Sequence, residues 1–170
     1  MSNKNSRINN YLSLPRIDKI VVSVGLGEHK ENKELTESIG KEIAEITGQK
    51  PKIARAKKSI SGFKIRENQH IGYVVTLRGK TMNGFLNKLI KVVLPRVRDF
   101  DGINEKSLDK CGNLNFSIKE QVFFPEIKPD ESKCVWGMTI TISLKKKTDP
   151  VIAKDYFKKL GFIFKGGENG

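Results

Sequence analysis

Alternating apolar and polar residues, or runs of β-branched residues, mark four segments that we expect to be β-strands. These segments are 17–24 (IDKIVVSV), 71–78 (IGYVVTLR), 114–118 (LNFSI) and 135–144 (VWGMTITISL). Successive side chains of a strand point to opposite faces, so the last two segments should each have one apolar and one polar face. The polar face of 135–144 carries Thr139, Thr141 and Ser143. A shorter extended piece is predicted at 52–54.

Three other segments have apolar residues every three or four positions and are expected to be amphipathic helices. They are 31–47, 81–94 and 150–160. Gly48 and Gly161 follow two of these segments, where a C-terminal cap is expected. Asp149 and Thr81 are the expected N-caps of the third and second helices. Pro95 should break the second helix, because proline cannot continue a helix beyond its own first turn.

The order of these elements predicts a single α+β domain. Its sheet should be mostly antiparallel, with helices packed on one face and the other face open. The open face would expose threonine and serine hydroxyls that can hydrogen-bond to the sugars and phosphates of RNA. We expect the domain to span residues 15–164, between flexible segments at 1–14 and 165–170.

The chain is strongly basic, and this excess of positive charge indicates a polyanionic partner. It has 32 Lys and Arg residues against 19 Asp and Glu residues, a net charge of +13. Nucleic acid is the partner that best matches such a charge. No apolar run approaches the roughly 18 residues that a membrane span needs, so no membrane partner is expected. Acidic residues line the outer face of 31–47, so the positive charge should be concentrated elsewhere.

The stretch 54–66 (ARAKKSISGFKIR) is basic and contains no acidic residue. Its apolar residues follow neither the period of a strand nor that of a helix, so we expect a loop. Lys and Arg release counterions when they meet a polyanion, which makes this loop a natural phosphate-binding element. On composition alone, a solvated charged loop remains an equal alternative.

No residue pattern indicates catalysis or a metal site. The Gly25-Leu26-Gly27 sequence begins like a dinucleotide-binding loop, but Lys30 stands where the third glycine is required. Cys111 and Cys134 lack the paired spacing of a zinc site and are expected to be reduced thiols. Neither serine of the basic loop has the context of a nucleophile. We therefore expect no cofactor, no metal and no enzymatic activity.

Eight strings, in this order and spacing, resemble the large-subunit ribosomal protein five family, the bacterial and organellar type that binds 5S rRNA. They are LPRIDKIVVSVGLGE (14–28), ITGQKPKIARAKKSISGFKIRE (46–67), VTLRG (75–79), LPRVRDF (94–100), IKEQVFFPEI (118–127), GMTITI (137–142), KTD (147–149) and LGF (160–162). The resemblance covers nearly the whole chain, from about 14 to 164. It implies an α+β fold with a concave sheet, seated in the central protuberance of the large subunit.

The resemblance also implies partners and residues for three sites. For binding 5S rRNA it implies Ser23, Gln49, Lys50 and Thr76, with Ser23 standing where the family usually has Asn. For the loop that extends toward P-site tRNA it implies Arg55, Lys57, Lys58, Ser59, Ile60, Phe63, Lys64 and Arg66. For an inter-subunit bridge to a small-subunit head protein it implies Arg96, Arg98, Lys110 and Lys133. Large-subunit rRNA and neighbouring ribosomal proteins complete the implied partners.

The chain departs from the family pattern at its N-terminal end. The family normally has a helix and linker of roughly twenty-five residues before the string that corresponds to Leu14-Pro15-Arg16, whereas 14 residues precede Pro15 here. The shorter N-terminus, together with Lys and Asn usage typical of AT-rich coding, favours the mitochondrial matrix over a bacterial cytoplasm. The alternative from another functional class is a free-standing RNA chaperone or regulator, which would not co-sediment with the large subunit.

Overall fold

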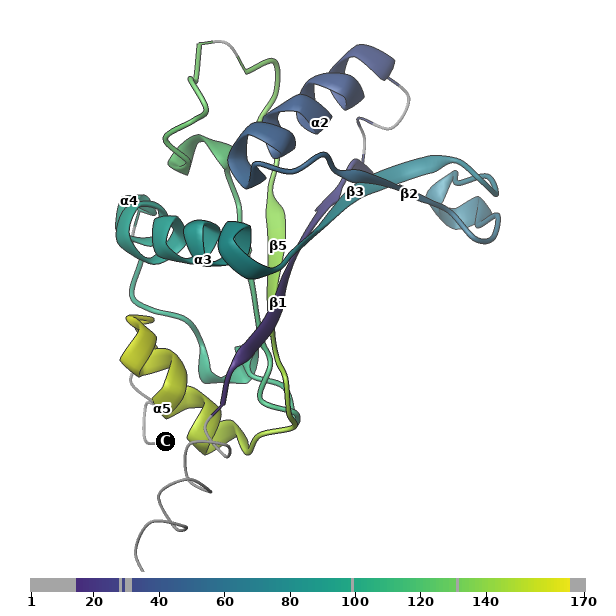
Figure 1. The fold of residues 1–170 in the computed structure, drawn as a ribbon. Coiled ribbons are helices and arrows are strands. Elements are labelled where there is room, and N and C mark those ends of the chain that lie inside the picture. Colours follow the sequence, from purple (N-terminus) through teal and green to yellow (C-terminus); the bar gives the residue numbers. More distant parts are fainter. Residues whose placement is uncertain (1–14, 28, 30–31, 99, 131, 166–170) are drawn as a thin grey trace, which may run out of the picture.

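A five-stranded antiparallel sheet forms the centre of the protein, with strand order β2-β3-β1-β5-β4 (Figure 1). The computed structural model describes residues 15–27, 29, 32–98, 100–130 and 132–165. The strands are β1 Ile17–Gly25, β2 Lys52–Arg55, β3 His70–Leu77, β4 Leu114–Ile118 and β5 Met138–Leu144. The predicted α+β class and antiparallel sheet are therefore confirmed. The predicted end segment 1–14, and residues 166–170 of the predicted tail 165–170, lie outside the described residues.

The helices lie on one side of this sheet (Figure 1). They are α2 Lys33–Thr47, α3 Gly79–Lys88, α4 Leu94–Arg96 and α5 Pro150–Leu160. A π-helical turn η3 (Leu89–Val93) joins α3 to α4, and short 3-10 turns are η2 Ser61–Phe63, η4 Glu105–Ser107 and η5 Gln121–Phe123. Asn32 caps α2 and Asp149 caps α5, each by a side-chain oxygen that accepts a backbone N–H. The predicted left-handed glycine caps Gly48 and Gly161 are confirmed.

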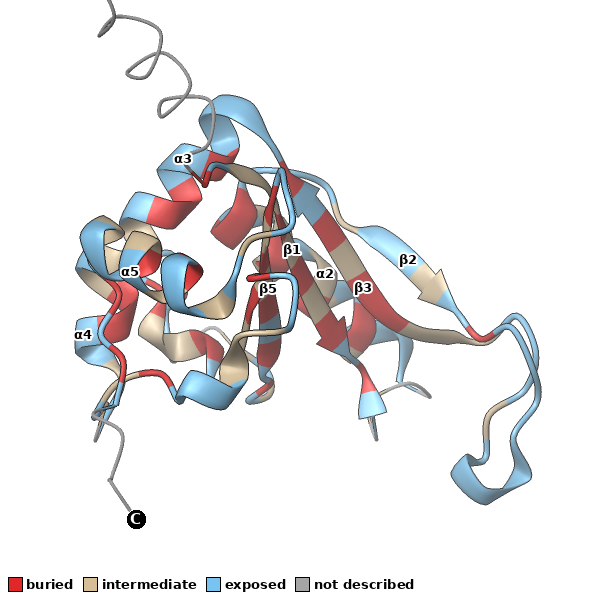
Figure 2. Ribbon diagram, turned by 90° about the horizontal axis from the view of Figure 1, so that it is seen from below, coloured by how far each residue is buried: buried red, intermediate tan, exposed pale blue. Residues whose placement is uncertain are grey.

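The central strand β1 separates the core from the open face by strict alternation. Ile20, Val22 and Val24 are buried, whereas Val21 and Ser23 between them are partly exposed. The apolar sides of β3, β5 and β4 continue this layer, and the helices cover it with their own apolar residues. Figure 2 shows the buried residues gathered between the sheet and the helices. The sheet is therefore two-sided, as the sequence predicted.

The second helix departs from its prediction at both ends. It begins at Gly79 rather than after Thr81, with Arg78 in the N-cap position and no side-chain capping bond. At the other end, Leu94 N–H donates to the carbonyl oxygen of Leu89, five residues back, which makes η3 a π turn. Pro95 has no N–H to donate into the preceding turn, and the helix ends one residue after it.

Strand β5 begins at Met138, so the prediction of a strand from 135 was wrong by three residues. The backbone of Trp136 is occupied by another partner, the buried side chain of Gln121. Trp136 N–H donates to Gln121 Oε1 at 2.9 Å, and Gln121 N–H donates to the Trp136 carbonyl oxygen at 3.1 Å. A tertiary hydrogen-bond pair has thus replaced the ladder that alternation alone predicts.

Two glycine-to-alanine variants should change stability in opposite directions. Gly48 has φ +67°, so an alanine there would adopt a strained left-handed conformation and lower the free energy of unfolding by about 1 kcal/mol. Gly84 lies inside α3, with open space around the position of a Cβ atom, so Gly84→Ala should raise it by about 0.5–1 kcal/mol. Urea unfolding of both variants measures the difference. Equal effects would contradict the capping role of Gly48.

Candidate nucleic-acid interface

The face of the sheet away from the helices, here called the open face, carries mainly hydroxyl and amide side chains. Its polar members are Lys19, Ser23, Thr76, Asn115, Ser117, Thr139, Thr141 and Ser143. Strands β1, β3, β4 and β5 contribute these residues because their apolar side chains face the core, which leaves the alternate positions facing outward. The apolar members, such as Val21 and Val74, are partly buried between them.

Strand register places the polar residues of the open face in rows across the sheet. Ser23 is paired with Thr139, and Thr139 is paired in turn with Ser117. The hydroxyl oxygens of Ser117 and Thr139 are 3.2 Å apart. In the next row the Thr141 hydroxyl donates to Asn115 Oδ1 at 2.8 Å. Neighbouring strands are about 4.8 Å apart, so each row presents closely spaced donors and acceptors.

The four residues implied for 5S rRNA gather at the β3 side of the open face. Thr76 and Ser23 lie on this face, and Ser23 is paired with Val74, two residues before Thr76. Gln49 reaches the same place, because its Nε2 donates to the carbonyl oxygen of Thr76 at 3.4 Å. Lys50 follows Gln49 and is exposed. The fold therefore brings together residues that are separated by more than fifty positions in sequence.

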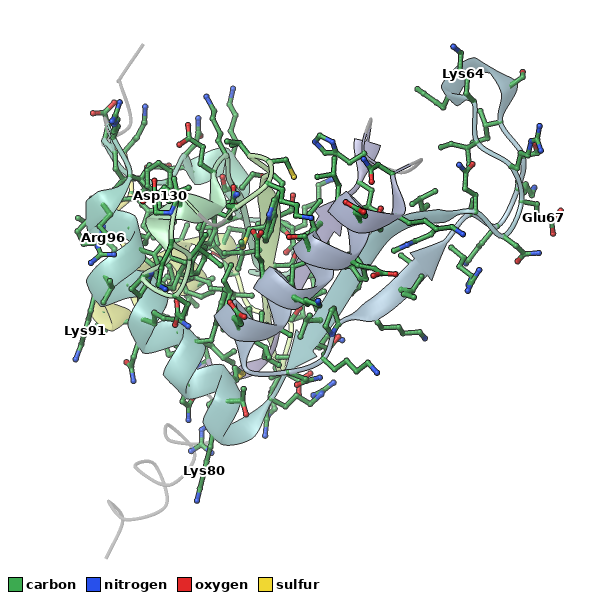
Figure 3. The ribbon with its side chains drawn as sticks, turned by 90° about the horizontal axis from the view of Figure 1, so that it is seen from above. Lys64, Glu67, Lys80, Lys91, Arg96 and Asp130 are labelled. Carbon is green, nitrogen blue, oxygen red and sulfur yellow. The ribbon has the colours of Figure 1, made fainter. Side chains whose placement is uncertain are left out.

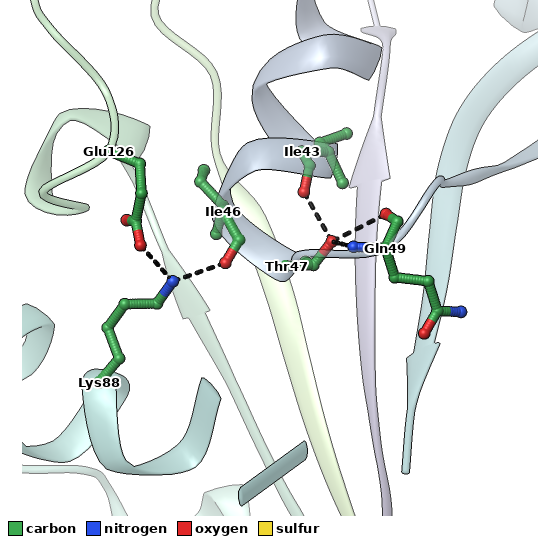
Figure 4. A network of polar contacts seen from close by, with 6 residues as sticks. All are labelled: Ile43, Ile46, Thr47, Gln49, Lys88 and Glu126. Atoms are coloured by element: carbon green, nitrogen blue, oxygen red, sulfur yellow. Dashed lines mark hydrogen bonds and ion pairs between the residues drawn. The ribbon is translucent and has the colours of Figure 1, made fainter. Parts of the chain in front are cut away.

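The end of α2 positions Gln49. The buried hydroxyl of Thr47 donates to the Ile43 carbonyl oxygen at 2.7 Å and accepts the Gln49 N–H at 3.4 Å (Figure 4). Lys88 of α3 fixes the same helix end, because its Nζ donates to the Ile46 carbonyl oxygen at 2.7 Å. These contacts hold the chain where it leaves the helix and turns toward β2.

The basic loop Arg55–Arg66, here called the basic arm, projects from β2 and β3 beyond the edge of the body (Figures 1 and 2). Its base is held by two backbone hydrogen bonds of 2.9 Å, from Ala56 N–H to the Gln69 carbonyl oxygen and from Asn68 N–H to the Ala56 carbonyl oxygen. The bridge between Ile60 and Ile65 closes its tip. The loop prediction is confirmed, with one short 3-10 turn.

The basic arm exposes both cations and apolar side chains. Lys57, Lys58 and Arg66 are exposed, and 71% of Phe63 and 47% of Ile60 are accessible to solvent. The remaining implied arm residues are also exposed, and they are Arg55, Ser59 and Lys64. Figure 3 shows Lys64 near the far end of the arm. The residues that sequence singled out here thus lie together on one projection.

The four cations implied for an inter-subunit bridge do not form one cluster. Arg96 and Arg98 are exposed at the end of α4 and just after it. Lys110 lies before β4, next to Cys111, whose carbonyl oxygen accepts the Thr148 N–H close to the start of α5. Lys133 lies beyond the other end of β4, where its Nζ is 3.5 Å from a carboxylate oxygen of Glu34 in α2. The resemblance to the family had implied a common edge for them.

The turn that carries Lys110 is organised by Asp109. Its Oδ1 accepts the N–H groups of Cys111 and Asn113 at 2.8 and 2.9 Å, and its Oδ2 accepts the Asn113 side-chain amide at 2.8 Å. Burial alone would raise the pKa of the Asp109 carboxyl, but these hydrogen bonds outweigh it and lower the pKa. The same turn is attached to the end of β5, because Leu144 N–H donates to Asn113 Oδ1 at 3.0 Å.

The described residues contain no cluster of three or more His, Cys, Asp or Glu side chains that could hold a metal ion. Cys111 and Cys134 are both free thiols, and burial together with Glu42 raises the pKa of the Cys134 thiol. Within the same residues, no helix has the length and apolar character to cross a membrane.

Sequence reasoning missed three polar members of the open face as site residues, Lys19, Asn115 and Ser117. The alternation in 114–118 already placed Asn115 and Ser117 on one face. What it lacked was the strand register, which sets them beside Thr141 and Thr139. Register depends on pairing between distant segments and cannot be read from one strand alone.

Comparison with known proteins shows which family this sequence resembles. Residues 10–66 match the family described as ribosomal protein L5, and residues 70–164 match the model that describes the C-terminus of the same ribosomal family. The large ribosomal subunit protein uL5 of Halothermothrix orenii is 50% identical over 91% of this chain and 86% of its own length. That of Thermosipho melanesiensis is 49% identical over 92% of this chain and 85% of its own length.

The relatives also include a plastid-type protein, uL5c of Gracilaria tenuistipitata var. liui. It is 52% identical over 86% of this chain and 82% of its own length. Bacterial and plastid-type relatives give no support to the mitochondrial preference drawn from residue usage and the short N-terminus.

The Asp109 turn predicts a pH dependence of stability. A carboxyl whose folded pKa is below its unfolded value of roughly 3.9 stabilises the fold above that value and loses this contribution as pH falls through the folded pKa. Asp109→Asn should therefore be less stable than the unsubstituted chain at pH 7, and the two should converge toward pH 3. Urea unfolding at both pH values checks this. A difference that grows on acidification would contradict the assignment.

Proposed function

The chain belongs to the ribosomal protein L5 family, and from this premise we propose that it binds 5S rRNA through the open face of its sheet. As a family member it is a structural, non-enzymatic constituent of the large ribosomal subunit, with rRNA and ribosomal proteins as partners. The observation that carries the proposal is the set of hydroxyl and amide rows on the open face, with Gln49 and Lys50 at its margin.

Hydroxyl and amide rows suit the RNA backbone because they offer donors and acceptors at short, regular intervals. Ser and Thr hydroxyls each donate one hydrogen and accept two, and they can serve both the 2′-OH and the phosphate oxygens. Such contacts fix the position of a protein on RNA without reading its sequence. Lys19, Lys50 and Lys52 at the margins add charge that attracts the polyanion.

Ser23 has a particular place in this proposal, because it lies in the row that includes Thr139 and Ser117. The serine side chain is shorter than the asparagine usual in the family. Its contact with RNA should therefore pass through a bridging water molecule, a geometry that retains most of the enthalpy of a direct hydrogen bond.

The basic arm is assigned a different partner, P-site tRNA. It projects beyond the β2–β3 edge of the body and carries five cations, Arg55, Lys57, Lys58, Lys64 and Arg66. An exposed array of Lys and Arg suits a sugar-phosphate backbone, and the exposed side chains of Ile60 and Phe63 can pack against a ribose or brace the tip. The separation between arm and open face allows two RNA molecules to be bound together.

The third proposed contact is an inter-subunit bridge to a small-subunit head protein. Arg96 and Arg98 form its basic part at the end of α4. Lys110 and Lys133 lie on other parts of the surface, so a single compact partner would contact at most a part of the set. An extended partner segment is needed to reach all four cations.

A charge placed on the open face should weaken 5S rRNA binding. Thr76→Glu puts a carboxylate among the hydroxyl rows, where a nearby phosphate would repel it, and affinity should fall at least about tenfold. Val151→Glu is the matched control, because Val151 is an exposed β-branched residue on α5 and the change in net charge is the same. Filter binding with purified 5S rRNA measures both. Equal losses would refute the sheet assignment.

Neutralising cations of the basic arm should weaken the binding of tRNA and leave the binding of 5S rRNA nearly unchanged. In Lys57→Ala/Lys58→Ala/Arg66→Ala, 5S rRNA affinity should stay within about twofold, while the salt dependence of tRNA binding by reconstituted ribosomes falls by roughly 2 in log K against log salt.

The matched control for the arm variant is Lys145→Ala/Lys147→Ala/Lys159→Ala, which removes the same charge from exposed positions outside the arm. This control should leave tRNA binding unchanged. A collapse of 5S rRNA affinity in the arm variant would show that the division between arm and open face is wrong.

A further inference from the structure

Helix α3 carries a polar stripe on the side that points away from the sheet. The stripe consists of Lys80, Asn83 and Asn87 of α3 and Lys91 of the turn η3 that continues it, all exposed and spaced three or four residues apart. Residues at this spacing lie on one line along a helix. Figure 3 shows Lys80 and Lys91 pointing away from the body of the protein. We call these four residues the α3 stripe.

The α3 stripe has charge and hydrogen-bonding capacity that the described residues do not use. The sequence contains no acidic residue between Glu67 and Asp99. Within the described part of the chain, neither lysine of the stripe has an ion-pair partner and neither asparagine side chain makes a hydrogen bond. Lys88, on another side of the same helix, differs because it pairs with Glu126 at 2.5 Å.

The centre of the stripe has no long side chain, whereas each of its ends carries a long lysine side chain. Gly84 lies beside Asn83 and Asn87, and the space that a Cβ atom of residue 84 would occupy is open. Lys80 and Lys91 are separated by about 16 Å along the helix axis, at about 1.5 Å per residue. Two long cationic side chains therefore flank a flat region that exposes short amides.

We propose that the α3 stripe docks across the minor groove of an RNA duplex, a further RNA contact on the opposite side of the protein from the open face. The minor groove of A-form RNA is wide and shallow and displays 2′-hydroxyls, whereas its major groove is too deep and narrow for side chains. The amides of Asn83 and Asn87 contact the 2′-hydroxyls. Lys80 and Lys91 reach the phosphates on either side.

Other partners fit the stripe less well. Single-stranded nucleic acid is bound largely by stacking on aromatic side chains, and the stripe has none. Protein interfaces depend on buried aromatic or arginine anchors, and the stripe has neither. The aliphatic and aromatic residues of α3 are turned inward, where Met82, Phe85 and Leu86 are buried.

The inference goes beyond the proposed function, because it adds an RNA contact distinct from those assigned to the open face and to the basic arm. With an RNA on each side, the chain would hold two RNA segments at a fixed separation set by the sheet and one layer of helices. A protein of this charge has cations enough for both surfaces.

The test uses the full chain saturated with 5S rRNA, so that the open face is occupied, and a labelled RNA duplex of sixteen base pairs (about 1.5 turns of the duplex). Fluorescence anisotropy at several salt concentrations should show binding that prefers this RNA to a DNA duplex of the same sequence. In Lys80→Gln/Lys91→Gln the slope of log K against log salt should fall by about 1.5. Lys158→Gln/Lys159→Gln is the charge-matched control and should leave the slope unchanged.

Two further variants test shape and 2′-OH recognition without threatening the fold. Gly84→Leu places a good helix former in open space but raises the flat centre, so duplex affinity should fall at least about tenfold. Gly84→Ala should fall much less. Asn83→Ala/Asn87→Ala should reduce the preference for RNA over DNA.

The proposal is overturned if the lysine variant behaves like its control, or if Gly84→Leu binds the duplex as well as the unsubstituted chain. Loss of association with ribosomal particles together with normal duplex binding would assign the stripe to a protein partner instead. Failure of the unsubstituted chain to bind 5S rRNA would refute the proposed function. The comparison among stripe variants on the duplex would then still decide this inference.

Discussion

Hydrogen bonding of β1 along both of its edges is the constraint on which the structure depends. β1 is paired with β3 on one side and with β5 on the other. A strand held on both edges cannot shift by one residue without turning its apolar side chains outward. The alternation of Ile20, Val21, Val22 and Ser23 therefore fixes which face of the whole sheet is core and which is open. Every assignment to the open face follows from this register.

Much of the fold could be predicted because local chemistry and global packing agree. The alternation in β4 and β5, the glycine cap at Gly48 and the Asp149-Pro150 helix start all retain in the folded protein the roles that their sequence indicates. The failures occur where a distant partner intervenes. Trp136 is not part of the strand, because its backbone is hydrogen-bonded to Gln121, fifteen residues earlier. No local sequence pattern predicts this contact.

The candidate site was predictable in its residue types but not in its arrangement. Sequence identified the hydroxyl-bearing face of 135–144 and the basic loop, since both depend on local composition. The contact between Gln49 and Thr76, and the separation of Lys110 from Lys133, depend on how the sheet and α2 pack together. Proximity in three dimensions is the information that a single sequence does not carry.

The basic arm is anchored lightly, and this has a consequence for variation among related chains. Among its described residues, Ala56 is the one buried side chain, and the base is held mainly by backbone hydrogen bonds. Loops of this kind tolerate changes of length and sequence, because such changes do not alter the packing of the core. Evolution could therefore lengthen, shorten or recharge this projection while the body stays the same.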